Sequence, residues 1–227
     1  MAKDTTGRLH VTVKSAGKRK LSSKLWLERQ LNDPYVTRAR REGFRSRAAY
    51  KLTEIDDKYH LFKVGMTVVD LGAAPGGWSQ VAAKRVGVAS GKGRVVAIDL
   101  LEMPEIAGVT FAQIDFLDQS APERLMVMME GRADVVMSDM AANTTGHRKT
   151  DQLRMVGLVE TAAAFAAEVL KPGGTFLAKT FQSGADAQLM GQLKRDYASV
   201  RHVKPAASRQ DSSERYVLAT GFRGGNA

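Results

Sequence analysis

Two ionisable side chains end apolar segments, at places where a reaction would need a charged group. Asp139 follows the run 135–137, and Lys179 follows the run 176–178. Lysine is uncommon at the end of an apolar run unless its amine is paired or functional. When nothing else indicates a function, such a lysine more often extends its amine into solvent. Enzymes that methylate exocyclic amines commonly carry Asn/Asp-Pro-Pro-aromatic at this aspartate. The sequence here is Ser-Asp-Met-Ala, which argues against methylation of a base nitrogen.

A glycine-rich turn lies between an apolar segment, 66–71, and a helical one. Its sequence is Gly72-Ala73-Ala74-Pro75-Gly76-Gly77-Trp78. Glycines let the backbone turn sharply and approach a ligand, and ligands bind at the carboxyl edge of parallel sheets. A dinucleotide site needs G-x-G-x-x-G, and Ala74 replaces the second glycine, which disfavours a pyrophosphate ligand. The turn alone is a weak signal, because a purely structural turn is about as common.

Two aspartates end the next two predicted strands. Asp99 follows the segment 93–98, and Asp115 follows 109–114 directly before Phe116. The first carboxylate is placed to accept both hydrogen bonds of a ribose diol. The second is placed to accept from an adenine amino group beside an aromatic ring. Each alone is more simply explained as a helix cap. Ligand-type positions at the ends of three successive strands together predict a site for an adenosine-bearing ligand.

The surrounding segments predict an α/β fold. Short apolar segments alternate with helical ones, which implies a mostly parallel sheet covered by helices on both faces. We predict strands at 66–71, 93–98, 109–114, 133–137 and 174–178, and helices at 76–86, 118–130, 150–170 and 185–197. Residues 200–203 and 216–220 follow in quick succession, and they predict an antiparallel hairpin at the edge of the sheet.

The N-terminal quarter is strongly basic. The chain has 227 residues and a net charge of +10, and residues 1–50 hold 13 of its 34 Lys and Arg but only 4 of its 24 Asp and Glu. This concentration suits a polyanionic partner, since each neutralised phosphate releases counterions, although a solubilising tail is about as common. We expect residues 1–20 to be a flexible basic arm, 21–60 a basic helical extension that contacts this partner, and 61–227 the main domain.

Two helices are predicted within this extension. The first is capped by Ser22 or Ser23 and ended by Asp33-Pro34, and the second runs from about Tyr50 to Tyr59. Five arginines cluster between them and are the candidates for phosphate contacts: Arg38, Arg40, Arg41, Arg45 and Arg47.

The composition excludes several chemistries. The chain has no cysteine, which rules out disulfides, iron–sulfur clusters and a cysteine nucleophile. Its four histidines are scattered, so we expect no metal site. Residues 1–10 lack the apolar core of a secretion signal, and 155–170 is too short and too charged to span a membrane. We therefore expect a cytoplasmic protein, and a monomer.

The ordered set of motifs resembles one known family. Over residues of about 20 to 222 the chain resembles the FtsJ/RrmJ type of ribosomal RNA 2′-O-methyltransferase. The resemblance rests on the segments Arg45–Leu52, Asp70–Gln80 and Ser138–Ala141 and on the surroundings of Lys179 and Glu214. The set is specific even though each part alone is not.

The resemblance implies a fold, a cofactor and site residues. The fold is a Rossmann-like class I methyltransferase domain over 61–227, with a seven-stranded, mostly parallel sheet whose C-terminal strand is antiparallel. The methyl donor is S-adenosylmethionine, without a metal. The implied catalytic tetrad is Lys51, Asp139, Lys179 and Glu214. The cofactor contacts implied here or predicted from the turn and strand ends are Gly72, Ala73, Pro75, Gly76, Gly77, Trp78, Asp99, Asp115, Phe116 and Asp139.

The reaction implied is transfer of the methyl group to a ribose 2′-hydroxyl, of a uridine in 23S ribosomal RNA, with the assembled large subunit as partner. The extension 21–60 and its five arginines would then bind RNA. Lys179 would act as the base or would orient the hydroxyl. The same reaction on transfer RNA is an alternative. So is a non-catalytic ribosome assembly factor, against which stands the complete tetrad. A nucleotide-dependent oxidoreductase is disfavoured by Ala74 and by the basic N-terminal segment.

Overall fold

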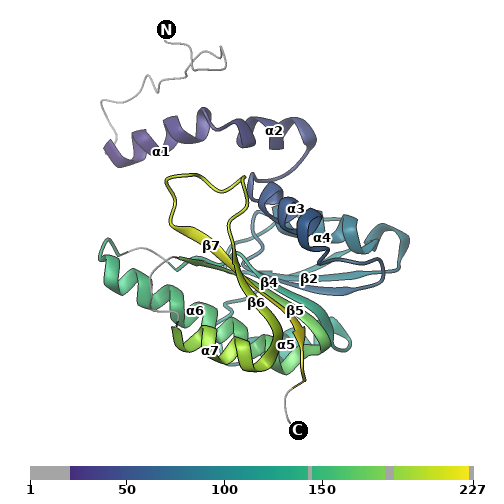
Figure 1. The fold of residues 1–227 in the computed structure, drawn as a ribbon. Helices are drawn as coiled ribbons and strands as arrows, with labels where there is room; N and C mark the ends of the chain where they lie inside the picture. The colour runs from purple at the N-terminus through teal and green to yellow at the C-terminus, as the bar shows by residue number, and fades with distance from the viewer. Residues whose placement is uncertain (1–20, 143–144, 182–186, 225–227) are drawn as a thin grey trace.

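The computed structural model in Figure 1 describes residues 21–142, 145–181 and 187–224, and they contain one sheet of seven strands. The strand order is β3-β2-β1-β4-β5-β7-β6. The strands are β1 (Thr67–Leu71), β2 (Arg94–Asp99), β3 (Val109–Gln113), β4 (Ala133–Ser138), β5 (Leu170–Phe181), β6 (Tyr197–Val203) and β7 (Glu214–Phe222). Every predicted strand is present, and β5 begins earlier and ends later than predicted.

The sheet is parallel except for one strand. Strands β1 to β5 pair in parallel, whereas β7 is antiparallel to both β5 and β6. The predicted mostly parallel sheet with a reversed C-terminal strand is therefore confirmed. The hairpin of β6 and β7 is also present, but its reversed member is not at the edge, because β7 inserts between β5 and β6. This insertion brings the start of β7 beside the end of β5.

Helices cover both faces of the sheet. Val68 and Val69 are both fully buried but belong to different hydrophobic clusters, because successive side chains of a strand point to opposite faces. One cluster includes residues of α3 and α4, and the other includes residues of α5, α6 and α7. These helices are α3 (Ala48–Tyr59), α4 (Gly77–Val86), α5 (Ala121–Met129), α6 (Arg148–Val169) and α7 (Ala187–Asp196), and a 3₁₀ turn, η2, spans Val88–Ser90.

Two more helices precede α3, namely α1 (Leu21–Leu31) and α2 (Pro34–Glu42). The predicted end of the first helix at Asp33-Pro34 is correct, but the same residues also begin α2, which was not predicted. The Asp33 carboxylate accepts the N–H of Tyr35 at 3.0 Å, Pro34 is the first helical residue, and Gly43 ends the helix at φ +76°. Ser22 and Ser23 lie inside α1 rather than before it.

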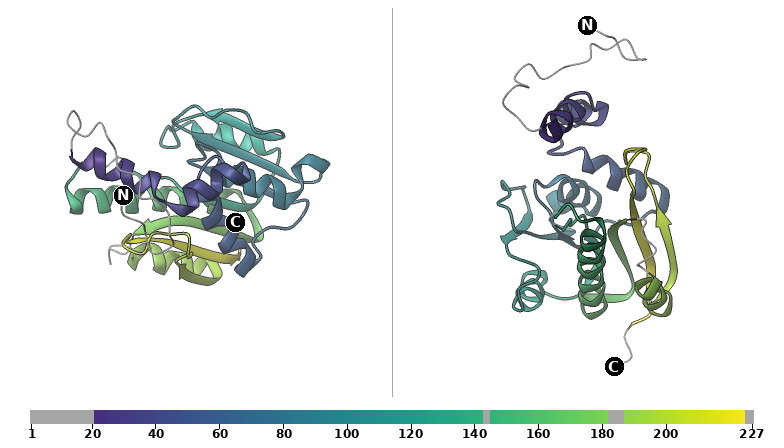
Figure 2. Two further views of the ribbon diagram at one scale, coloured as in Figure 1. Left: turned by 90° about the horizontal axis from the view of Figure 1, so that it is seen from above. Right: turned by 90° about the vertical axis from the view of Figure 1, so that its left-hand side faces the viewer.

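Helices α1 and α2 lie above the edge of the sheet at which the parallel strands end (Figures 1 and 2). The loop between β6 and β7 extends toward them. Ala207 of this loop packs in a small cluster with Ala39 of α2 and Tyr50 of α3. The predicted extension 21–60 thus has two parts, since α3 packs into the core while α1 and α2 lie over the sheet edge. The arm predicted at 1–20 lies outside the described residues.

Candidate active site

The topology brings three of the four tetrad residues to one edge of the sheet. Asp139 directly follows β4, and Lys179 lies near the end of β5. Because β7 runs in the opposite direction, its first residue, Glu214, lies opposite Phe181 at this same edge, and Tyr216 lies opposite Lys179. Side chains of directly opposite residues project from the same face, and so do those two residues apart. Lys179, Glu214 and Tyr216 therefore share a face.

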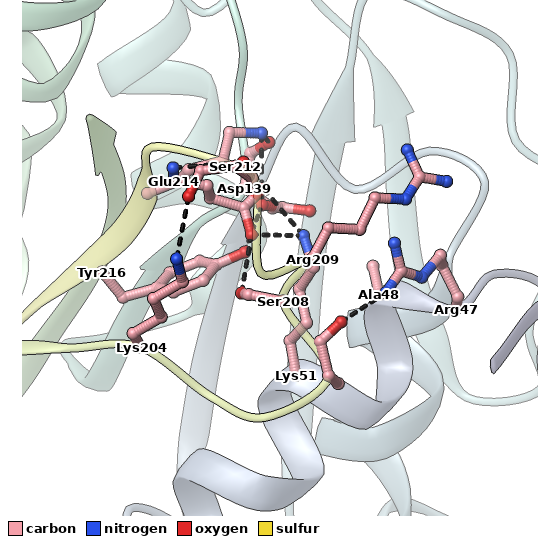
Figure 3. Close-up of polar contacts among 12 residues, drawn as sticks. Arg47, Ala48, Lys51, Asp139, Lys204, Ser208, Arg209, Ser212, Glu214 and Tyr216 are labelled. Carbon is pink, nitrogen blue, oxygen red and sulfur yellow. Dashed lines mark hydrogen bonds and ion pairs between the residues drawn. The ribbon is translucent and has the colours of Figure 1, made fainter. Parts of the chain in front are cut away.

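The fourth tetrad residue comes from the helix that covers this face. Lys51 lies on α3, and its Nζ is 2.7 Å from Oε1 and 2.8 Å from Oε2 of Glu214 (Figure 3). Lys179 Nζ is 3.2 Å from Oδ1 of Asp139 and also donates to the Asp139 carbonyl oxygen. The four side chains are 10–19% exposed. Since burying ions is costly unless they are paired, these two pairs form a desolvated frame that holds its geometry.

Tyr216 joins the two ion pairs, and sequence reasoning did not single it out. Its hydroxyl donates to Oδ1 of Asp139 at 3.1 Å, and its ring centroid lies 5.8 Å from Lys51 Nζ and 5.5 Å from the ring of Trp78. Burial, together with the negative charges of Asp139 and Glu214, holds the pKa of Tyr216 well above its ordinary value. The hydroxyl therefore stays protonated and acts as a donor. The available signal was its position two residues after Glu214 in a strand.

The pKa of Glu214 lies below its ordinary value. Burial raises it, but the charge and hydrogen bond of Lys51 and a hydrogen bond from Ser208 outweigh that effect. Glu214 is therefore a carboxylate at neutral pH.

The glycine turn connects β1 to α4 at the same edge. Gly72 has φ +77°, and a Cβ there would lie 2.5 Å from Cγ of Met140, so only glycine fits. Beneath the turn, Asp70 is fully buried and accepts a hydrogen bond from the Ser79 hydroxyl at 2.6 Å. Burial raises the pKa of Asp70 to about 7. Its other carboxylate oxygen has no hydrogen-bond partner among the described residues.

The two strand-end aspartates hold loop backbones. The Asp99 carboxylate accepts the N–H of Ala74, in the glycine turn, and of Leu101, both at 2.8 Å. Exposed Asp115 accepts the N–H of Leu117 at 2.9 Å. Neither caps a helix, contrary to the simpler interpretation of these residues. Each carboxylate retains free acceptor capacity, because an ionised carboxylate accepts about four hydrogen bonds.

Three predicted cofactor contacts lie differently from expectation. Phe116 is 6% exposed and packs edge-on against Phe165 in the core, with ring centroids 5.8 Å apart, so its ring does not border a surface site. Trp78 is 2% exposed, and its indole donates to the Ala48 carbonyl at 2.9 Å. A Cβ at Gly77 would lie 2.3 Å from the Ser46 hydroxyl. These residues join α4 to α3 or fill the core.

The five predicted RNA-binding arginines divide into two groups. Arg45 donates to the carbonyls of Pro75, Pro104 and Glu105 and so ties the glycine turn to the loop after β2. Arg47, whose side chain is 15% exposed, forms an ion pair with Asp33 at 3.1 Å.

The other three arginines lie on α2. Arg40 and Arg41 are exposed, while Arg38 bonds Glu42 at 2.8 Å and lies 4.5 Å from the ring centroid of Tyr50. The first group has internal partners, and the second faces solvent.

Two further tests concern metals and membranes. In the described part of the chain no three His, Asp or Glu side chains come together as a metal site would require. Its helices include none with the length and hydropathy needed to cross a membrane.

One protein family and several known proteins match this chain. The sequence pattern of the FtsJ-like methyltransferases matches residues 44–222. Proteins named ribosomal RNA large subunit methyltransferase E are 82% identical in Bradyrhizobium sp. strain ORS 278 and in Rhodopseudomonas palustris strain TIE-1. The matches cover 99% and 100% of this chain and 97% and 96% of those proteins. A Plasmodium falciparum crystal structure, provisionally named a ribosomal RNA methyltransferase, shares 28% identity and a TM-score of 0.72 over 80% of this chain and all of that one.

Proposed function

Because this chain belongs to the FtsJ-like methyltransferase family, we propose that it methylates a ribose 2′-hydroxyl in 23S RNA of the large ribosomal subunit, on a uridine. The observation that carries the proposal is the buried frame of Lys51, Asp139, Lys179 and Glu214 at the carboxyl edge of the sheet. The alternatives, transfer RNA as substrate and a non-catalytic assembly factor, gain no support from the names of the relatives. The compartment we propose is the cytoplasm, where bacterial ribosomes are assembled.

The donor we propose is S-adenosylmethionine, which supplies a methyl group on a sulfonium and needs alignment with the nucleophile more than acid catalysis. The residues present suit it. Asp99 and Asp115 retain acceptor capacity for ribose hydroxyls and an adenine amine, and the unpartnered oxygen of Asp70 lies beneath the turn. The contacts proposed are Gly72, Ala73, Pro75, Gly76, Asp99, Asp115 and Asp139. The predicted contacts Gly77, Trp78 and Phe116 would contribute only backbone groups, because the side chains of Trp78 and Phe116 pack internally.

The tetrad would act on the hydroxyl. As the new C–O bond forms, the methyl–sulfur bond breaks with its electron pair remaining on sulfur, and the ribose oxygen must lose its proton. Lys179 is the group that we place beside that oxygen. Its amine takes up the proton, or its ammonium directs an oxygen lone pair toward the methyl carbon and the proton passes to water. A pH–rate profile separates the two, because only the first requires a neutral lysine. Asp139 fixes Lys179, and Tyr216 ties Asp139 to the Lys51–Glu214 pair.

The RNA would be held by α2. Its exposed arginines, Arg40 and Arg41, lie on a helix above the edge of the sheet that carries the tetrad (Figure 1). Arg38 adds a third positive charge on the same helix. Arg45 and Arg47 support the fold of this region rather than contact RNA, because their guanidinium groups have internal partners.

The deciding experiment measures transfer of labelled methyl groups from S-adenosylmethionine to unmodified large subunits, naked 23S RNA and bulk transfer RNA. Each product is digested to nucleosides. We expect label in 2′-O-methyluridine from large subunits. Label only in transfer RNA would overturn the target but keep the reaction, and absence of label with the cofactor bound would favour the assembly factor.

A further inference from the structure

A serine outside the tetrad contacts its carboxylate. The hydroxyl of Ser208, in the loop between β6 and β7, donates to Oε1 of Glu214 at 2.9 Å, the same oxygen that lies 2.7 Å from Lys51 Nζ (Figure 3). Ser208 is 5% exposed. Lys51 alone allows the carboxylate to turn about the axis between the two groups, whereas a second donor on one oxygen fixes its plane.

The N-terminal helices hold this serine in place from both sides. The N–H of the preceding residue, Ala207, donates to Glu54 of α3 at 2.9 Å, and its carbonyl accepts from Arg47. The following residue, Arg209, donates to the Asp33 carboxylate at 3.2 Å. Residues 207–209 are thus attached to the helical extension at each position except the serine itself, whose hydroxyl is left to bond Glu214.

Asp33 is the common anchor of these contacts. Its carboxylate binds Arg47 at 3.1 Å and Arg209 at 3.2 Å, and it also caps α2 through the N–H of Tyr35. It is 8% exposed, so the two arginines neutralise a charge that would be costly to bury alone. The helix that presents Arg40 and Arg41 to solvent is therefore connected to Glu214 through one buried aspartate and one loop.

We propose that Ser208 is a positioning residue for methyl transfer, which orients Glu214 against Lys51. The Asp33–Arg47–Arg209 cluster holds Ser208 in the position where it contacts Glu214. The inference rests on the proposed function and deepens it. It gives the N-terminal extension a second task, which is to complete the catalytic frame in addition to contacting RNA.

The first test compares Ser208→Ala, Ser208→Thr and, as a matched control on the same loop, exposed Ser213→Ala. We expect Ser208→Ala to lower kcat roughly 10- to 100-fold, because small misplacements of a catalytic group have effects of this size. KM for large subunits, cofactor affinity by calorimetry and Tm should stay near those of the wild type. Threonine keeps the hydroxyl and should restore most of the rate, and Ser213→Ala should match the wild type. Equal kcat in wild type and Ser208→Ala would overturn the inference.

A measurement without catalysis tests the same contact. The Glu214 carboxyl carbon, assigned with a Glu214→Gln variant, is titrated by ¹³C NMR in wild type and Ser208→Ala. Loss of a donor to the charged form should raise the pKa of Glu214. An unchanged titration refutes the contact, whatever the activity. If the wild type methylates no RNA, the proposed function and the catalytic part of the inference fail together, whereas activity in wild type and Ser208→Ala alike refutes only the inference.

The anchor is tested with Asp33→Asn. Asparagine caps a helix about as well as aspartate, so α2 is preserved while the charge that binds Arg47 and Arg209 is removed. We expect a lower kcat than in the wild type and no additional loss when Asp33→Asn is combined with Ser208→Ala, because both act through Glu214. Fully additive effects in this double-mutant cycle would separate the cluster from Ser208.

Discussion

Lys179 and Tyr216 both contact Asp139, but we propose different roles for them. Lys179 contacts both the carboxylate and the carbonyl of Asp139, whereas Tyr216 makes one hydrogen bond to that carboxylate. Removing a group that faces the reacting atom differs from removing one that only supports it. The contrast between these two residues therefore separates direct from indirect participation.

Lys179→Ala should lower methyl transfer by ~10²-fold or more, since a positioned acid–base group has effects of this order. Affinity for the cofactor, measured by calorimetry, should change little. A variant that retained more than about a tenth of normal turnover would exclude an essential role.

Tyr216→Phe should cost only a few-fold in kcat, because Lys179 still holds Asp139 and the ring still packs on Trp78. Tm should change little. A loss as large as that of Lys179→Ala would place the tyrosine hydroxyl at the reacting atoms.

Asp70 links stability to pH. Its pKa is raised by burial to about 7, so the folded state holds a proton that the unfolded state loses near its ordinary pKa of 3.8. Stability from this group is therefore present at low pH and is lost as pH rises toward 7. Asp70→Asn does not titrate. In urea unfolding, we expect the free energy of unfolding of the variant, relative to wild type, to rise between pH 4 and 7. A constant difference would contradict the raised pKa.

At the scale of elements, local sequence predicted the strands and most helices. Apolar runs bounded by turns mark β1, β2 and β4, because each is buried on both faces. Helix α2 is not predicted from the sequence, because Asp33-Pro34 there marks only the end of the preceding helix. An N-cap aspartate, a first-turn proline and a final glycine are nevertheless the signals that begin and end a helix. Tyr216 and Ser208 could not be found locally, since their roles depend on β7 pairing with β5. The burial of the Phe116 ring against Phe165 of α6 likewise depends on tertiary packing and could not be predicted from the sequence around Asp115.

Helix α2 should contribute electrostatically to RNA binding. Arg40→Ala and Arg41→Ala should each weaken binding of 23S RNA and reduce the slope of log affinity against log salt by ~1. At saturating RNA, kcat should be unchanged. Lys194→Ala, an exposed charge on α7 at the opposite end of the molecule, is the control. If Lys194→Ala weakened RNA binding equally, binding would depend on the overall positive charge of the protein rather than on α2.

For the whole molecule, the charge of +10 is concentrated in the first quarter of the chain. Part of it is used internally, since Arg45 and Arg47 bond other protein groups. Arg40 and Arg41 of α2 are exposed above the sheet edge, where phosphates can reach them. Affinity for ribosomal RNA should therefore fall steeply with salt, by at least ~10-fold between 50 and 200 mM, as counterion release predicts. A salt-independent affinity, measured by filter binding, would show that recognition depends on other contacts.

The position of β7 also has a consequence for synthesis of the protein. Translation produces Lys51, the glycine turn, Asp139 and Lys179 before the reversed strand that supplies Glu214. A nascent chain therefore acquires the glycine turn before it can complete the proposed catalytic frame. A product terminated before β7 would also leave β5 with an unpaired edge, which invites pairing with other chains. Such truncated chains would thus be inactive and prone to aggregate. Synthesis of β7 would therefore complete the proposed site and cover the edge of β5 in one step.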